Sequence, residues 1–327
     1  MKSLIAMIAF TFFSVIRADE LIDSLRQNSL ANVNALVILT TQDMLTSGKY
    51  TFDNGPDTAG LHVTNFPLYY HFNPLFNRFN LFVNGSAGYS KFDTDIDWSE
   101  ELGTSITSDD YMAYETVALR LGGGVRYVSS IDIYVLAGFD FIYSRIKNRY
   151  DYNSQASKVV LKEKFEEAFA NQYSNAYTYE LFWQIGYTPV WAEWKPYIIL
   201  SLNYFDTKQD LSVKQLSSFH STSGGSRLKV GFETPQFFHL FNTGLSSEFF
   251  LAANAFTGDV RETLGFDGYG SSAAMLHFYI DSAFYGEVDE VLYHVPSILN
   301  RIDLMVERVN GDGIEGYNIG VGAGFNF

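Results

Sequence analysis

A two-residue alternation of apolar and small polar side chains recurs along almost the whole chain and sharply limits the folds open to it. In RFNLFVNGSAGYSKF, apolar or aromatic residues stand at every second position around Leu81, Val83 and Tyr89, with Asn, Ser and Gly between them. Successive side chains of a β-strand point to opposite faces, so this period predicts strands with one apolar and one polar face. The same pattern recurs in YMAYETVALRLGGGVRY, IDIYVLAGFDFIY and GYNIGVGAGFNF, which predicts an all-β fold.

The distribution of aromatic residues decides between two kinds of all-β fold. A soluble sandwich also alternates, with its apolar face inward. Here 17% of residues are aromatic and they gather at strand ends, while the opposite face is rich in Gly, Asn and charged residues. A transmembrane barrel has an apolar outer face, a polar interior and aromatic girdles at both interfaces. The sequence therefore favours a transmembrane antiparallel β-barrel over a sandwich.

Segment counting predicts about twelve strands, because bacterial single-chain barrels have even strand numbers. SGKYTFD at residues 47–53 is the candidate for the first strand. The others are expected at residues 59–73, 78–92, 111–128, 131–144, 177–189, 195–207, 225–234, 245–257, 272–284, 300–309 and 314–327. If the C-terminus lies in the periplasm, the turns expected on the periplasmic side are NPLFN, SS and TPVWAE, all of them short. Residues 93–110, 145–176 and 208–224 are then long external loops.

The N-terminal stretch MKSLIAMIAFTFFSVIRADE predicts export. A basic Lys2 precedes an apolar run that is short for a bilayer span and ends near Ala18, so residues 1–18 are expected to be a signal peptide. A buried N-terminal helix is the alternative. Residues 19–46 carry apolar side chains at helical spacings, which predicts a helical segment that either plugs the lumen or stays in the periplasm. The barrel is then expected over residues 47–327, in the outer membrane of a Gram-negative bacterium.

The net charge of the chain limits the classes of binding partner to be expected. The chain has a formal net charge of −15 and contains no cysteine. Such acidity argues against nucleic acid and against anionic lipid headgroups as partners. The expected partners are outer-membrane lipid along the apolar face and, as alternatives left open, a small solute or a divalent cation.

Four charged residues are expected to face the lumen. Arg120 and Arg126 share the polar face of one expected strand, and Asp132 and Asp140 share that of the next. One hairpin register places Arg120 opposite Asp140, and the other places Arg126 opposite Asp132. Either register predicts an inward ion pair that packs a polar lumen, with a solute-selecting constriction as the alternative.

The segment KFDTDIDWSEELGTSITSDD carries a calcium-loop spacing at Asp93, Asp95 and Asp97. Trp98 stands where the turn of such a loop needs Gly, and Thr104 stands where a bidentate Glu is needed. We therefore expect a solvated acidic loop and no metal site, with surface binding of a divalent cation as the alternative.

The sequence contains few features that would indicate catalysis. His220 and His277 each have acidic neighbours, Asp206 and Asp281 among them, but no Gly-x-Ser-x-Gly or other nucleophile setting accompanies them. The sequence predicts no enzymatic activity and no cofactor.

The order of a helix-prone segment and about twelve strands ending in an aromatic residue resembles the translocator barrel of autotransporters. NFPLYYHFNPLFNRFNLFVNGSAGYSKF and GYNIGVGAGFNF are similar to strands of the solitary outer membrane autotransporter-like barrels. This resemblance implies a structural, interaction or translocation-type role without catalytic residues. Only residues 19–46 separate the expected signal from the barrel, so no passenger is expected. The alternative is a passive channel for small solutes.

The last strand also resembles the signal that the barrel-assembly machinery reads in outer-membrane proteins. The resemblance assigns folding and membrane insertion to Tyr317, Gly322, Phe325 and Phe327.

Overall fold

The computed structural model describes residues 45–53, 58–72, 78–97, 109–129, 131–153, 173–211, 219–240, 243–264, 267–280 and 299–325. The expected signal peptide, most of the segment at 19–46, residues 154–172 of the expected external loop, Asp281 and Phe327 lie outside these residues. The expectations that rest on them stay predictions.

Twelve long antiparallel strands form the barrel wall. They are β1 (Leu45–Asp53), β2 (Thr58–His71), β3 (Phe79–Asp97), β4 (Asp109–Val128), β5 (Ile133–Asp151), β6 (Tyr173–Tyr187), β7 (Lys195–Leu211), β8 (Phe219–Glu233), β10 (Thr243–Gly258), β11 (Gly268–Ile280), β12 (Leu299–Gly311) and β13 (Ile314–Phe325). Two short elements are attached to β10, namely β9 (Phe238–Leu240), which pairs with its start, and α4 (Asp259–Leu264), which follows its end.

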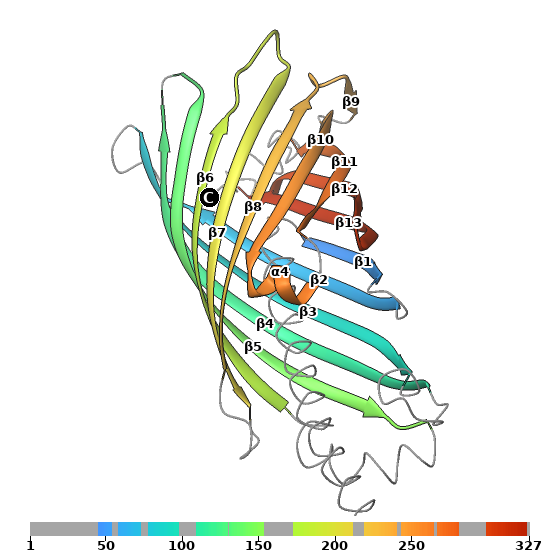
Figure 1. Cartoon of the computed structure of the whole chain (residues 1–327). Helices are drawn as coiled ribbons and strands as arrows, with labels where there is room; N and C mark the ends of the chain where they lie inside the picture. The colour runs from blue at the N-terminus through green and yellow to red at the C-terminus, as the bar shows by residue number, and fades with distance from the viewer. Residues whose placement is uncertain are drawn as a thin grey trace, which may run out of the picture.

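Pairing of the first and last strands closes the barrel. β1 lies antiparallel to β13, with Lys49 opposite Tyr317, and Figure 1 shows the blue β1 beside the red β13. β10 pairs with both β8 and β11, which completes the ring. Since every wall strand is paired along both edges, the wall has no open sheet edge facing lipid. The prediction of a twelve-stranded transmembrane barrel is confirmed.

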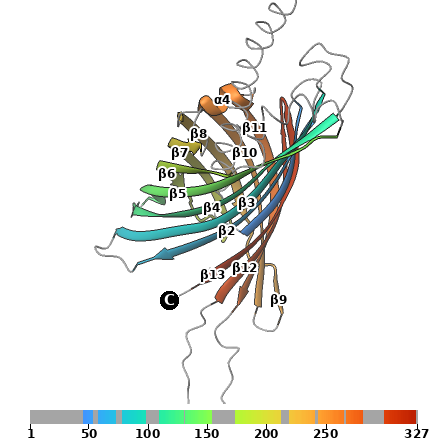
Figure 2. The same ribbon diagram turned by 90° about the horizontal axis from the view of Figure 1, so that it is seen from below.

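The two ends of the barrel differ in their connections. Residues 129–132 and 188–194 connect strands at the end where β9 lies, whereas intervals such as 98–108 and 154–172 separate strands at the end where α4 lies (Figure 2). The short connections at 54–57 and 312–313 are exceptions at the α4 end, and the long interval at 281–298 is an exception at the β9 end. Outer-membrane barrels keep short turns in the periplasm and long connections outside. We therefore name the β9 end the periplasmic end and the α4 end the outer end.

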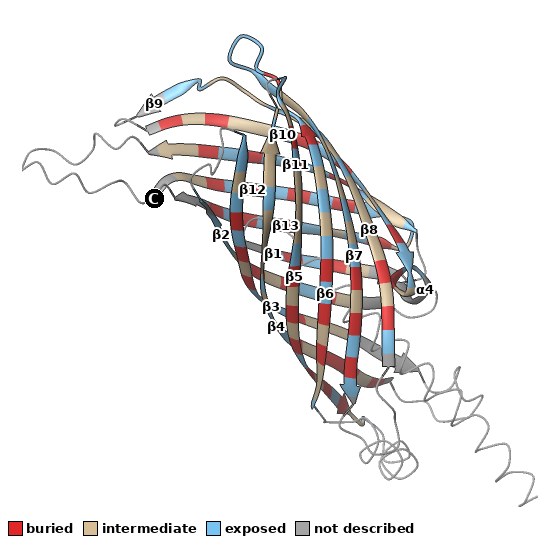
Figure 3. Ribbon diagram, turned by 90° about the vertical axis from the view of Figure 1, so that its left-hand side faces the viewer, coloured by how far each residue is buried: buried red, intermediate tan, exposed pale blue. Residues whose placement is uncertain are grey.

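Exposure alternates along each strand as the sequence predicts. On β6, Tyr179, Leu181 and Trp183 are exposed, while Thr178 and Glu180 between them are buried. Figure 3 shows this alternation as changes between pale blue and red along the strands. The exposed set is aliphatic and aromatic, so the outside of the wall is the apolar face and the polar face lines the lumen.

Several strands run beyond the limits expected from the alternation. β3, β4 and β5 contain 19, 20 and 19 residues, whereas a tilted strand crosses the hydrocarbon with about 9–11. β3 and β4 stay paired as far as Asp97 and Asp109, so the expected external loop at 93–110 is wrong at both of its ends, where residues 93–97 and 109–110 belong to strands. The reason is that the hairpin hydrogen bonds continue after the lipid-facing pattern has stopped. β1 likewise begins at Leu45, two residues before the expected start.

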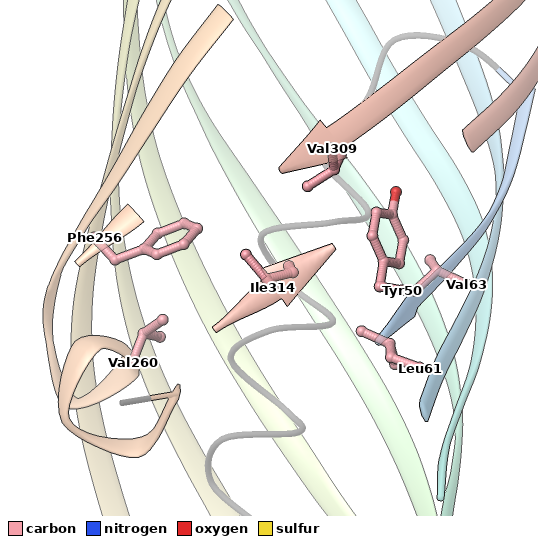
Figure 4. Close-up of a cluster of buried hydrophobic side chains, with 7 residues drawn as sticks. All are labelled: Tyr50, Leu61, Val63, Phe256, Val260, Val309 and Ile314. Carbon is pink, nitrogen blue, oxygen red and sulfur yellow. The ribbon is translucent and has the colours of Figure 1, made fainter. Parts of the chain in front are cut away.

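Apolar side chains also gather inside the barrel near its outer end. This inner apolar cluster comprises Tyr50, Leu61, Val63, Phe256, Val260, Val309 and Ile314, all buried (Figure 4). Its members come from β1, β2, β10, α4, β12 and β13. The Asp259 carboxylate accepts a hydrogen bond from the Thr222 backbone N–H at 2.8 Å, which ties α4 to β8.

The described helical structure gives no membrane span: no helix in this part of the chain is long and apolar enough to cross a bilayer.

Candidate functional site

Two networks of charged and polar side chains line the lumen, which is where a solute or a polypeptide would pass through a barrel. The Arg120 network comprises Asn84, Arg120, Asp140, Glu180 and Asn203 on β3 to β7. The Glu248 network comprises Tyr197, Lys229, Glu248, His277, Arg301 and Asp303 on β7 to β12.

One guanidinium serves two carboxylates in the Arg120 network. Arg120 forms an ion pair with Asp140 and lies 3.2 Å from a Glu180 oxygen, and both acidic side chains are 0% exposed. The Asn84 amide donates to Asp140 at 3.1 Å, and the Asn203 amide donates to Glu180 at 2.6 Å. Because buried charges are costly unless they are paired and hydrogen-bonded, the network depends on its single cation.

The hairpin register that brings Arg120 and Asp140 together is neither of the two expected ones. β4 and β5 pair Gly122 with Asp140 and Arg120 with Ile142, so Arg120 reaches Asp140 diagonally. The two residues share a face, as the parity of the alternation requires. Gly122 makes this register fit, because a β-carbon there would overlap the Asp140 carboxylate and the Phe139 carbonyl.

Arg126 and Asp132 do not meet. Arg126 lies opposite Leu136, with its guanidinium 4.8 Å from the centre of the Tyr134 ring, a cation–π arrangement. Asp132 is exposed in the β4–β5 turn with a φ of 59°, and its carbonyl accepts a hydrogen bond from Thr188. The expected pairing of these two residues is therefore wrong, since Asp132 belongs to the turn and not to the strand face.

Glu248 is the centre of the second network. One of its oxygens accepts a hydrogen bond from Lys229 at 2.9 Å and another from the Tyr197 hydroxyl, and the other oxygen lies 3.1 Å from His277 Nε2. His277 Nδ1 lies 2.6 Å from Asp303, which also pairs with Arg301 at 2.9 Å. Of these residues, the sequence pattern indicated His277 but not Glu248, Asp303 or Glu180, although all three lie at inward positions of their strands and parity alone could have indicated them.

Charge inside the lumen is largely compensated in pairs. Beyond the two networks, Lys195 pairs with Glu233 at 2.9 Å and Arg227 pairs with Glu307 at 3.3 Å. Arg120, Lys229 and Arg301 have the carboxylate partners given above. Among the lumen-facing Lys and Arg residues within the described strands, Arg126 is the exception, with an aromatic ring in place of a carboxylate. A lumen with this pairing presents little net charge to a passing ion.

The row Ser246, His277 and Asp303 has the residue types of a hydrolase triad, but its hydrogen bonds are different. The Ser246 hydroxyl donates to Glu233 at 3.0 Å, and His277 directs its second nitrogen to Glu248. A nucleophile needs a hydrogen bond to its base. This row is therefore arranged as an ion-pair network and not for nucleophilic attack.

The candidate calcium spacing lies on a strand. Asp93, Asp95 and Asp97 occupy alternate positions of β3, paired across to Ala113, Tyr111 and Asp109. An extended strand holds such residues apart along one face and cannot wrap them around a cation, so the calcium-loop comparison fails. Within the described residues, no group of three or more His, Cys, Asp or Glu residues is placed to hold a metal.

The remaining predicted site residues lie on strands as well. His220 is on β8, not in a loop, and its Nε2 lies 2.6 Å from Asp206 on the exposed side. Tyr317 is 54% exposed on β13, and Gly322 faces inward opposite Asp303. The assignment of Tyr317, Gly322, Phe325 and Phe327 to barrel assembly stays a prediction.

Replacing Gly122 with alanine should lower the free energy of unfolding by about 1–3 kcal/mol, because the new methyl group displaces Asp140 and the adjacent backbone. Gly225→Ala is the matched control, since its β-carbon meets nothing closer than Phe205 Cε2 at 3.9 Å. Urea unfolding of the detergent-folded barrel measures both variants. Equal stabilities would show that the Gly122 position tolerates a side chain.

A family model described as a solitary outer membrane autotransporter beta-barrel domain matches residues 31–276. A search of curated proteins found no match.

The solved structures that resemble the barrel include three autotransporter domains. The translocator domain of NalP from Neisseria meningitidis has a TM-score of 0.57 at 11% identity, covering 90% of this chain and 93% of that one. The β domain of the Bordetella autotransporter BrkA has 0.56 at 11%, covering 86% and 96%. The transport unit of AIDA-I from Escherichia coli has 0.52 at 9%, covering 92% and 99%. At these identities the likeness concerns the fold alone.

Proposed function

Because this chain belongs to the solitary outer membrane autotransporter β-barrel family, we propose that it is a translocator-type barrel with a filled lumen and a structural or interaction role at the cell surface. We propose residues 19–44 as the segment that fills the lumen, after removal of a signal peptide at 1–18. The competing role is a passive channel for small solutes.

The inner apolar cluster is the observation that supports a filled lumen most strongly. Seven buried apolar side chains face inward near the outer end, Val260 with 0% exposure. A water-filled pore at this level would leave these side chains wet, at a cost of about 25 cal/mol for each Å² of apolar area. Their burial therefore supports a lumen that is closed to water here. The same side chains are favourable against an apolar face of a polypeptide, and the apolar residues of 19–44 recur at helical spacings.

The paired charges of the lumen support the same proposal. Channels that select ions use rings of uncompensated charge or carbonyl groups. Here the Arg120 network and the Glu248 network satisfy their cations internally. Such pairing stiffens a wall and leaves few groups free to attract a solute.

Single-channel recording in planar bilayers tests the proposal. The mature chain is expected to show little or no steady conductance, and a chain lacking residues 19–44 should conduct several-fold more. A large steady conductance of the mature chain would establish the channel role instead. Equal closure of both forms would contradict residues 19–44 as the occupant and place the seal in the barrel wall itself. Heat-modified migration on gels confirms folding of both chains.

A further inference from the structure

A row of mainly basic residues runs around the outside of the barrel near its outer end. We name it the outer row; its members are Arg308, Tyr317, Lys49, His62, Lys91, Glu115 and Lys147. Each is the direct cross-strand partner of the next, from β12 through β13, β1, β2, β3 and β4 to β5. Neighbouring strands lie about 4.8 Å apart, so Arg308 and Lys91 are separated by about 19 Å of wall.

The outer row borders the lipid-facing band. On β12, Arg308 follows the outward residues Leu304 and Val306 at the same two-residue spacing, and on β3 Lys91 follows Tyr89 in the same way. Both cations lie on the side of their apolar neighbours toward the outer end. In an outer-membrane barrel this is the level of the headgroups of the outer leaflet.

The cations of the row lack carboxylate partners among the described residues. Lys49 and Arg308 are exposed and take part in no ion pair in this part of the chain, and Lys91 lies 5.5 Å from the centre of the Tyr111 ring. His62 is hydrogen-bonded to Ser47 at 3.1 Å. This contrasts with the lumen, where Lys229 and its counterparts hold carboxylates at 2.9–3.3 Å.

Acidic residues also stand near the row, on its side toward the outer end, with Asp95 on β3 and Asp151 on β5 among them. Glu115 lies opposite both Lys91 and Lys147 without an ion pair to either, and Asp93 and Glu315 occupy the next outward positions on β3 and β13. Four Lys or Arg side chains and one His therefore stand against one Glu within the row. In a chain with a net charge of −15, this local excess of positive charge is opposite in sign to the whole.

We propose that the outer row binds the phosphate groups of lipopolysaccharide in the outer leaflet. Guanidinium and ammonium groups form charge-assisted hydrogen bonds with phosphate oxygens, and clusters of basic residues at a bilayer surface attract anionic lipids. Tyr317, between Arg308 and Lys49, is an interfacial aromatic residue suited to the same level. This proposal is opposite to the expectation, drawn from net charge alone, that anionic headgroups are not partners. The proposal is independent of whether the lumen is filled.

Native mass spectrometry of the full chain in neutral detergent tests this binding. Bisphosphorylated lipid A is the probe, with dephosphorylated lipid A and inorganic phosphate as comparisons. The native chain is expected to bind the bisphosphorylated lipid at least about tenfold more tightly than the dephosphorylated one. Tight binding of inorganic phosphate alone would point to a free anion site instead of a lipid site, and equal affinity for both lipids would overturn the proposal.

Charge-removing variants locate the site. Lys49→Gln with Lys91→Gln and Arg308→Gln should weaken lipid A binding by at least about tenfold. The control removes three cations outside the row, Arg149→Gln, Lys208→Gln and Arg261→Gln, and should stay within about twofold of the native chain. Equal losses in both variants would overturn the assignment. If the triple variant fails to fold by heat-modified migration, the single variants and the charge-preserving pair Lys49→Arg with Lys91→Arg decide, since only the single Gln variants should lose affinity.

Discussion

Replacement of Arg120 with methionine is expected to lower the free energy of unfolding by about 3–5 kcal/mol. Methionine keeps much of the side-chain volume but leaves Asp140 and Glu180 adjacent, fully buried and without their cation. Asn84 and Asn203 each donate one hydrogen bond to the pair, which cannot offset two buried negative charges. Equilibrium urea unfolding of the full chain in detergent micelles, followed by tryptophan fluorescence, measures the loss.

Two further variants separate charge from packing. Arg126→Met is the matched control, because Arg126 lies on the same strand face but contacts the Tyr134 ring, and its cost should stay near 1 kcal/mol. Neutralising the orphaned acids in Arg120→Met by Asp140→Asn and Glu180→Gln should restore at least half of the lost stability. An Arg120→Met cost no larger than that of Arg126→Met would contradict the dependence of both acids on one cation.

The barrel could be predicted because each strand shows its lipid-facing surface as an alternation of apolar and polar residues within a few consecutive positions. On β13, Tyr317, Ile319 and Val321 are exposed by 54%, 53% and 42%, as their alternation with Gly and Asn indicates. Where a strand leaves the membrane the alternation ends, since both faces of the strand then contact water. For that reason the sequence pattern places Asp93 in a loop although it lies inside β3, and it ends the strands too early on the outer side.

The lumen networks could not be read in the same way, because they depend on register between strands. Glu248 and His277 are 29 residues apart, and only the pairing of β10 with β11 brings them together. A two-residue shift changes partners without changing faces, so parity predicted that Arg120 and Asp140 share a side but not that Gly122 lies opposite Asp140. The need for glycine at position 122 becomes visible only in the folded barrel, where the Asp140 carboxylate occupies the space that a side chain at Gly122 would take.

Glu248→Gln is expected to lower the free energy of unfolding by about 3 kcal/mol, the second large effect. Glutamine has nearly the same shape but no charge, so Lys229 loses its carboxylate and buried His277 keeps only Asp303. The Tyr197 hydroxyl retains an oxygen acceptor, which separates loss of charge from loss of a hydrogen bond. The same urea unfolding measurement applies.

Two further variants test the interpretation of Glu248→Gln. One neutralises a carboxylate on the outer face of the barrel, and the other removes the cation that pairs with Glu248. Glu315→Gln, on the exposed side of β13, should change stability by no more than about 0.5 kcal/mol. Adding Lys229→Met to Glu248→Gln should recover part of the loss, because the unpaired ammonium is then removed from the lumen. A Glu248→Gln cost equal to that of Glu315→Gln would mean that water in the lumen screens these charges, and the barrel interior would then be wet enough to favour the channel role over a filled lumen.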